Sequence, residues 1–337
     1  WVLPSIRRLS AATPGNDYRL GETEAPPAII SIFLGEQLED VIWQLVNTGS
    51  ATSSKQGGKL RLANNLPAFS KDATDRNRTS PFAFTGNKFE FRMVGSSDSV
   101  ASANTVLNAI VAEVFCETAD ILEKADNVEL AIHDIIKQYA TEHQRIIFNG
   151  NGYSEEWVEE AARRGLPNLK SMVDAIPALV YEDTVKLFEK FGIFTRAELE
   201  SRAEIQYEAY AKATNIEALT MIDMARKQII PAGIEFTKML AEAMVAKEKV
   251  GINCAAEKKL ASKASSLTNS ILEATEMLDD KLLEVKNCAE GEPTARYYRD
   301  VVFAAMQELR AVVDELETIT PDKMWPFPTY ADLLFKV

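Results

Sequence analysis

The stretch Gly86-Asn87-Lys88-Phe89-Glu90-Phe91-Arg92 predicts a β-strand that begins after a turn. Apolar and charged side chains alternate along it, so an extended backbone puts both phenylalanines on one face and Glu90 and Arg92 on the other. If the charged face lines a cleft, Glu90 suits a hard divalent cation and Arg92 suits a substrate anion. The alternative is a solvent-facing Glu/Arg pair on a half-exposed strand.

Two other polar segments lie upstream of this strand. Arg76 and Arg78 are two positions apart, so in an extended backbone they point to the same side and suit a polyanionic ligand. The alternative for this pair is a solvated edge or a salt-bridge cluster. The loop from Arg19 to Pro27 contains Glu24, and its two prolines restrict the backbone enough to hold that carboxylate for proton transfer.

The first 100 residues are rich in Pro, Gly, Asn and Ser, a composition typical of strands and loops. Within them, the run Pro27–Leu34 has the β-branched content of a buried strand. We expect an inserted loop near residues 36–73, because Gly49–Gly58 is polar and glycine-rich.

From about residue 101 the composition changes to Ala, Leu, Glu and Lys, which predicts helices as far as about residue 318. Ser154 is a candidate N-cap, and Thr195 with Glu198 forms a candidate capping box. Pro231 lies inside a long helical pattern and lacks a backbone donor, so a kink or a break is expected there.

Two segments carry apolar residues at alternating spacings of four and three. The first set consists of Leu260, Ala264, Leu267, Ile271, Ala274 and Leu278, and the second of Tyr298, Val302, Ala305, Leu309, Val312 and Leu316. Gly291 and Pro293 supply a stop and a restart, so the two segments are expected to form an antiparallel helical hairpin. Its apolar stripes favour an intramolecular core over an oligomerisation seam. The aromatic, proline-containing segment 324–335 is expected to dock onto the folded body.

Charge and cysteine content exclude several classes of protein. The 337 residues include 50 acidic and 37 basic side chains, giving a net charge of -13, which disfavours nucleic acid and anionic membranes as partners. No apolar stretch approaches the roughly 20 residues that span a bilayer. The three widely spaced cysteines predict neither a disulfide framework nor a zinc site, which favours the cytoplasm.

Taken together, several motifs in this chain closely resemble those of glutamine synthetases, and specifically the C-terminal half of the long type III form. They are Arg19-Leu20-Gly21 with Glu24-Ala25-Pro26, Asn77-Arg78, Glu90-x-Arg92 within Gly86–Ser97, Gly150-Asn151-Gly152-Tyr153-Ser154, and Trp325-Pro326-x-Pro328-Thr329-Tyr330. The resemblance runs from about Ala11 to Val337, and motifs of this length in this order are hard to reach by chance.

The resemblance implies ATP-dependent ligation of ammonia to L-glutamate through a γ-glutamyl phosphate. It implies that Glu90 holds Mg²⁺ or Mn²⁺ and that Arg19 and Arg92 hold glutamate. Arg78, in a catalytic role, and Lys88 would attend the nucleotide or the transferring phosphate. The second catalytic residue would be Glu24, which closes over the site and takes a proton from ammonium.

The fold implied is α+β: residues 1–115 would be the C-terminal portion of the catalytic domain, with antiparallel strands and helices, and residues 116–337 a mostly helical bundle region. Because position 1 is Trp, we expect the chain to begin partway through a larger catalytic subunit and to supply only part of a site. The resemblance implies self-association into hexameric rings and a dodecamer. The alternative is a non-catalytic helical assembly or regulatory protein of synthetase ancestry.

Overall fold

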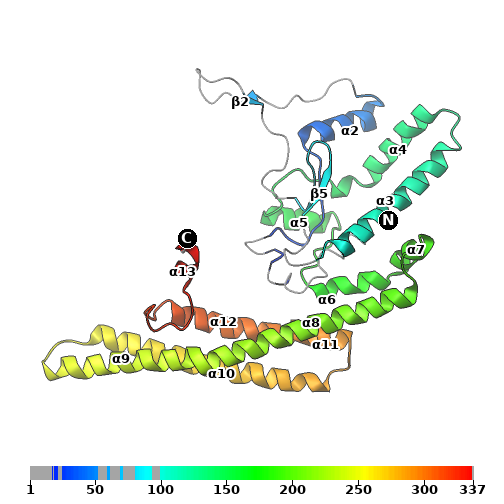
Figure 1. The fold of residues 1–337 in the computed structure, drawn as a ribbon. Helices are drawn as coiled ribbons and strands as arrows, with labels where there is room; N and C mark the ends of the chain where they lie inside the picture. Colours follow the sequence, from blue (N-terminus) through cyan, green and yellow to red (C-terminus); the bar gives the residue numbers. More distant parts are fainter. Residues whose placement is uncertain are drawn as a thin grey trace. The chain divides into compact units, whose positions relative to one another are not determined.

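The computed structural model describes residue 17 and residues 19–21, 25–51, 59–60, 69–70, 80–92 and 99–335. Contacts divide the chain into two compact units, Trp1–Gln206 and Tyr207–Val337 (Figure 1). The boundary at residues 115 and 116 that the resemblance implies stays a prediction. Within the described residues, no helix combines the length and apolar character needed to cross a membrane.

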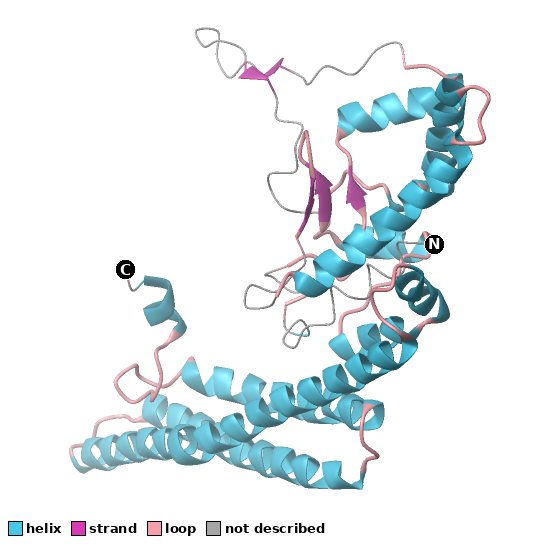
Figure 2. Ribbon diagram, turned by 45° about the vertical axis from the view of Figure 1, so that its right-hand side comes forward, coloured by secondary structure: helices cyan, strands magenta, loops and turns pink. Residues whose placement is uncertain are grey.

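A small mixed sheet organises the first unit (Figure 2). Its strand order is β1-β4-β5, with β1 at Ile32–Phe33, β4 at Phe82–Phe84 and β5 at Phe89–Phe91. The β4–β5 pair is antiparallel, as expected, but β1 runs parallel to β4, so the expectation of antiparallel strands holds only in part. A separate antiparallel pair joins β2 (Lys59–Leu60) to β3 (Phe69–Ser70).

The hairpin β4–β5 has the two faces that its alternating sequence predicts. Its register pairs Phe82 with Phe91 and Phe84 with Phe89, so residues directly opposite one another share a face. The rings of Phe82 and Phe89 stack with centroids 5.3 Å apart, and Phe82 meets Phe91 edge-on at 6.1 Å. This aromatic face leaves the other face of β5 to Glu90 and its charged neighbours.

The run Pro27–Leu34 is buried as expected from Pro27 to Ser31, although only Ile32–Phe33 forms a strand. The inserted segment that follows does not begin as a loop, because Glu36–Thr48 forms helix α2. Its apolar residues at Leu38, Val41, Ile42 and Leu45 recur at helical spacing, a signal that outweighs the polar residues between them. Gly49 ends the helix with a left-handed φ of 77°.

Helices and two apolar clusters surround the sheet. Among the described residues these helices are α3 (Ala101–Leu122), α4 (Val128–Glu142), η2 (Gln144–Ile146), α5 (Glu155–Arg163), α6 (Met172–Ala175), η3 (Ile176–Val180) and α7 (Glu182–Lys190), and α8 (Arg196–Met224) begins in this unit. One cluster buries Leu20 and Ala25 against α3 and α7. The other joins Ile29, Ile146 and Trp157. Leu20 and Ala25, on the two sides of the loop next to Arg19, are thus both buried in the hydrophobic core.

The predicted helix caps are confirmed. Ser154 Oγ accepts a hydrogen bond from the amide of Trp157 at 3.3 Å at the start of α5. Thr195 and Glu198 form the reciprocal capping box: the Thr195 amide donates to Glu198 Oε2 at 2.8 Å, and the Glu198 amide donates to Thr195 Oγ1 at 3.4 Å.

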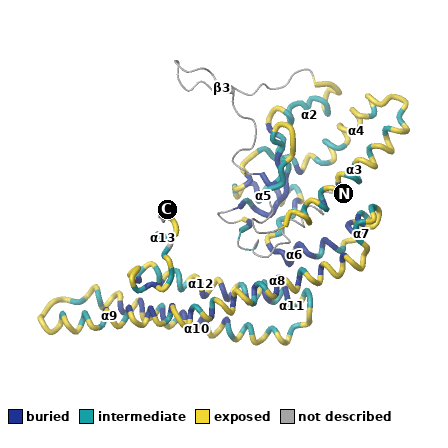
Figure 3. The backbone as a smooth tube through the Cα atoms, viewed as in Figure 1, coloured by how far each residue is buried: buried dark blue, intermediate teal, exposed yellow. Residues whose placement is uncertain are grey.

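The second unit is a bundle of long helices whose buried residues lie on the sides that face neighbouring helices (Figure 3). After α8 come η4 (Ala225–Ile229), α9 (Ile230–Lys249), α10 (Ala255–Glu284), η5 (Val285–Asn287), α11 (Glu292–Tyr297), η6 (Tyr298–Val302), α12 (Phe303–Glu317) and α13 (Tyr330–Phe335). The predicted packing of the two apolar stripes is confirmed, since α10 contacts α12 and most of both stripes is buried. Leu260 is an exception and is exposed.

The helix does not end at Pro231. A π-helical turn occupies Ala225–Ile229, and the amide of Ile230 donates to the carbonyl of Ala225, five residues back. This wider turn ends two residues before Pro231, which lacks the backbone donor that a regular helix would use at that position. In the terminal segment Trp325 is buried, whereas Leu333 and Leu334 of α13 are exposed, and docking of the whole segment stays a prediction.

Candidate functional site

A polar pocket of about 570 Å³ lies beside the β4–β5 hairpin in the first unit. Its lining residues are Arg19, Ala25, Pro26, Ser80, Pro81, Lys88, Glu90, Phe91, Arg92 and Tyr153. The pocket therefore brings together four of the residues that the sequence singled out, Arg19, Lys88, Glu90 and Arg92. The other two, Glu24 and Arg78, lie outside the described residues.

The charged wall of this pocket consists of Glu90 in β5 and the two residues that flank the strand, Lys88 and Arg92. Arg92 Nη2 lies 3.0 Å from Glu90 Oε2, and Lys88 Nζ lies 3.4 Å from Glu90 Oε1. The Arg92 side chain is only 15% exposed and that of Glu90 is 38% exposed, whereas Lys88 reaches into solvent at 66%. The strand pattern therefore correctly predicted that Glu90 and Arg92 share a face.

The charged neighbours of Glu90 keep its carboxyl ionised. The hydrogen bond from Arg92 is the largest cause that holds the pKa of Glu90 below its ordinary value, and Lys88 lowers it further, while partial desolvation opposes both. A carboxylate with a lowered pKa stays available as an oxygen donor for a cation, and the guanidinium next to it suits an anionic ligand.

The loop that carries Arg19 is closed at its base. Leu20 pairs with Ala25 in a parallel β-bridge, and the Gly21 amide lies 3.3 Å from the Ala25 carbonyl oxygen and 3.2 Å from that of Pro26. Gly21 has a φ of 83°, a conformation that L side chains rarely adopt, which explains the glycine. These contacts fix the backbone at Leu20 and Gly21 and at Ala25 and Pro26, on either side of Glu24.

Asp17 ties the same loop to the helical region. Its carboxylate accepts hydrogen bonds from Ser171 Oγ at 3.3 Å and from the amide of Met172 at 3.2 Å. Met172 begins α6, so Asp17 satisfies a backbone donor at the helix start. The backbone two residues before Arg19 is thus held by residues more than 150 positions later in the chain.

The carboxylate of Glu90 fits one position in a divalent-cation site. Within the described residues, no three His, Cys, Asp or Glu side chains group closely enough to hold a metal ion. Glu90 is also the only acidic side chain in the described lining of the pocket. This part of the chain therefore provides one hard oxygen ligand, whereas a six-coordinate Mg²⁺ needs further ligands from substrate, water or other residues.

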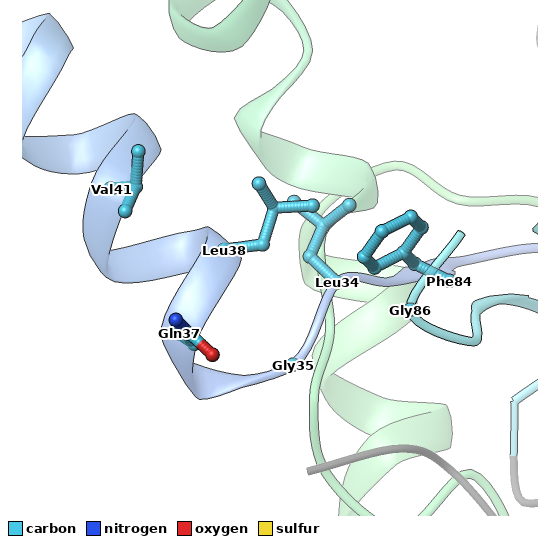
Figure 4. A pocket seen from close by; sticks show the side chains of 7 residues that line it. All are labelled: Leu34, Gly35, Gln37, Leu38, Val41, Phe84 and Gly86. Carbon is cyan, nitrogen blue, oxygen red and sulfur yellow. The ribbon is translucent and has the colours of Figure 1, made fainter. Parts of the chain in front are cut away.

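A second pocket has a different chemical character. It measures about 330 Å³ and is lined by Leu34, Gly35, Gln37, Leu38, Val41, Phe84 and Gly86. Figure 4 shows Leu34 between Leu38 of α2 and Phe84, with Gln37 the polar side chain of the set. None of these residues is charged, so this pocket lacks the charged side chains that surround the first one.

Tyr153 is, like Ser80, a polar lining residue of this pocket to which sequence reasoning gave no role. It lies in the predicted motif Gly150–Ser154, more than 60 positions after Arg92, and nothing in the residue pattern linked that motif to the strand. Only the tertiary pairing of the chain places them at one pocket.

Comparisons with known proteins give a consistent result. Residues 131–248 match the family model of the glutamine synthetase C-terminal domain. The chain is 39% identical over 337 residues to a glutamine synthetase from Butyrivibrio fibrisolvens, with 98% of this chain and 48% of the relative covered. It is 39% identical to a type-3 glutamine synthetase from Dictyostelium discoideum, with 98% and 46% covered, and 34% identical to a glutamine synthetase from Bacteroides fragilis, with 98% and 47% covered. The chain thus spans about half the length of the curated relatives it matches.

Proposed function

Because this chain is a homologue of the glutamine synthetases, their type-3 form included, we propose that it is the C-terminal part of a subunit that ligates ammonia to L-glutamate. The proposed reaction consumes ATP and passes through a γ-glutamyl phosphate. The observation that carries the proposal is the gathering of Arg19, Lys88, Glu90 and Arg92 around one pocket.

The charges of the pocket suit this reaction. Transfer of a phosphoryl group to a carboxylate brings several anions together, so fixed cations are needed to offset their repulsion. In our proposal Arg19 and Arg92 bind the glutamate, and Lys88 attends the nucleotide phosphates. Arg92 is well placed for this role because its low exposure strengthens its interaction with an anion relative to a fully solvated guanidinium.

Glu90 would hold a Mg²⁺ or Mn²⁺ ion. When bound, such an ion polarises phosphoryl oxygens and neutralises developing charge. Only the ionised carboxylate is a good ligand, and the lowered pKa of Glu90 is consistent with that form. Since the described lining offers this single carboxylate, the remaining protein ligands would come from outside the described part of the chain.

Two assignments rest on the resemblance and on sequence neighbours. Glu24 would close over the site and accept a proton from ammonium, and its neighbour Ala25 lines the pocket. Arg78 would contact the transferring phosphate, and Ser80, two positions later, lines the same pocket. We further propose assembly into hexameric rings and a dodecamer, in the cytoplasm.

The direct test is to assay the whole protein for conversion of L-glutamate to L-glutamine. Product should form only when ATP, ammonium and Mg²⁺ or Mn²⁺ are all present, and omission of any one should stop it. The rival function, a non-catalytic assembly or regulatory protein of synthetase ancestry, predicts stable oligomers with no turnover under any of these conditions. The mass of the intact subunit should also be well above the 37.4 kDa of this chain.

A further inference from the structure

We infer that Tyr153 is a ligand-contact residue of the pocket, whose phenol donates a hydrogen bond to an anionic oxygen of the bound substrate, either a carboxylate or a phosphate. This inference rests on the proposed function and adds a residue to it. Tyr153 comes from the motif Gly150–Ser154, yet it lines the same pocket as Arg19 and Arg92.

The segment before Tyr153 is fixed to the sheet. Ile147 forms a parallel bridge with Ile32 of β1, and the amide of Phe148 donates to the Ile32 carbonyl at 3.0 Å. Asn149 continues the attachment, because its Oδ1 accepts hydrogen bonds from the amides of Leu34 at 2.9 Å and Gly35 at 3.0 Å. The chain that leads to Tyr153 therefore extends the sheet at the edge of β1 opposite β4.

Close packing holds the next residues. The Phe148 ring stacks on Trp157, with centroids 3.7 Å apart and planes 9° from parallel, and Trp157 is buried. A Cβ at Gly150 would lie 2.5 Å from the Phe148 ring, which its stacking prevents from moving aside easily. Gly150 is thus a close-approach glycine that lets the backbone turn against this aromatic pair.

The turn itself is hydrogen-bonded on both sides of Tyr153. The Tyr153 amide donates to Asn151 Oδ1 at 3.0 Å, and the Ser154 amide donates to the Asn151 carbonyl at 3.3 Å. Ser154 then caps α5. Because the backbone is constrained on both flanks, little backbone conformational entropy remains to be lost when Tyr153 engages a ligand.

The side chain of Tyr153 is available for such a contact. The residue is 41% exposed although its neighbours in the turn are held, and none of the hydrogen bonds found for the described residues involves its phenol. A phenol among cationic side chains complements an anion, because it donates a hydrogen bond without adding negative charge. A hydrogen bond to a charged group typically changes affinity by about tenfold or more.

The test compares steady-state kinetics of the whole protein with those of Tyr153→Phe, which keeps the ring and removes only the hydroxyl. We expect KM to rise about tenfold for the substrate whose anion is contacted, while thermal unfolding stays unchanged. A rise in KM for glutamate identifies a carboxylate as the partner, and a rise in KM for ATP identifies a phosphate. Unchanged KM values for both substrates and unchanged kcat would overturn the inference.

Tyr181→Phe is the matched control, since Tyr181 is an exposed tyrosine of the same unit that does not line the pocket. It should leave both KM values unchanged, and an equal effect of the two variants would contradict a specific role for Tyr153. The two proposals fail separately. Lack of turnover by the unaltered protein contradicts the proposed reaction, whereas normal turnover by both the unaltered protein and Tyr153→Phe contradicts only the role of Tyr153.

Discussion

The guanidinium of Arg92 donates two hydrogen bonds to one oxygen of Glu90, with Nη2 3.0 Å and Nε 3.3 Å from Oε2. The other carboxylate oxygen, Oε1, lies near Lys88. A divalent cation that binds Glu90 must therefore compete with two cations that already neutralise it. Once displaced, those cations can turn toward the anions of a substrate, so metal binding and substrate binding are expected to favour one another.

Replacing Glu90 with Gln should abolish metal-dependent γ-glutamyl transfer by the whole protein, because the amide keeps the shape of the side chain but loses the charge that a hard cation needs. Activity as a function of Mg²⁺ or Mn²⁺ concentration measures the effect. Glu117→Gln, at an exposed position of α3, is the control and should behave as the unaltered protein does. Full activity in Glu90→Gln would rule out the metal role.

Arg92→Ala should raise the pKa of Glu90 toward its ordinary value, because the hydrogen bond from Arg92 is the main cause of the lowered pKa. In the unaltered protein this pair adds stability at neutral pH, and that contribution is lost as the pH falls through the lowered pKa. A carboxyl-carbon NMR titration, with the Glu90 signal assigned from Glu90→Gln, measures the shift. Arg163→Ala, which removes an ion pair elsewhere, should leave that signal unchanged.

Gly233→Ala should destabilise the helical bundle. The added Cβ would lie 2.4 Å from Thr268 Oγ1 and 3.2 Å from Leu316 Cδ2, and both partners are buried on neighbouring helices. Overpacking of this kind typically costs about 1–3 kcal/mol, which urea unfolding can measure.

Two variants sharpen this experiment. Thr268→Ala removes the nearer clash, so the double variant with Gly233→Ala should lose less stability than the sum of the two single variants. Glu235→Ala changes an exposed position on the same helix and should stay within about 0.5 kcal/mol of the unaltered protein. Additive losses at Gly233 and Thr268 would contradict the close contact.

Tyr297 should titrate late. Burial is the main cause that raises its pKa to about 12, and a hydrogen bond from its hydroxyl to Glu284 Oε2 at 2.7 Å adds to the effect. Since the folded pKa exceeds the unfolded one, the stabilisation is complete below about pH 10 and is lost as the pH rises toward 12. In a pH titration followed by ultraviolet absorbance, Tyr297→Phe should remove the phenolate signal that appears near pH 12, whereas Tyr181→Phe should leave that signal in place.

Features that depend on neighbouring residues could be predicted from the sequence. The cap at Ser154 and the capping box at Thr195 involve residues three positions away, so the pattern contains all the information required. The alternation from Phe89 to Arg92 likewise placed Glu90 and Arg92 on one face, because side-chain direction in a strand alternates with each residue.

Features that depend on distant partners could not be predicted in this way. Nothing in Ile32–Phe33 indicates a parallel pairing with β4, and a lone tyrosine at position 153 has no local mark of a ligand contact. The helix at Glu36–Thr48 was missed for another reason: the polar, glycine-rich segment after it dominated the composition of the region. At Pro231 the local rule identified the disturbed position but not its form, a π-helical turn.

The position of β1 between β4 and the segment around Ile147 affects how the protein folds during synthesis. This two-residue strand pairs on one side with β4 and on the other with the segment around Ile147, and Asn149 bonds to a residue 115 positions earlier. Closing such long loops costs chain entropy, and contacts between residues close in sequence do not offset this cost. During synthesis this second side of the strand can pair only after residues 147–149 have emerged from the ribosome, whereas the contacts between α10 and α12 join segments that lie close together in the sequence.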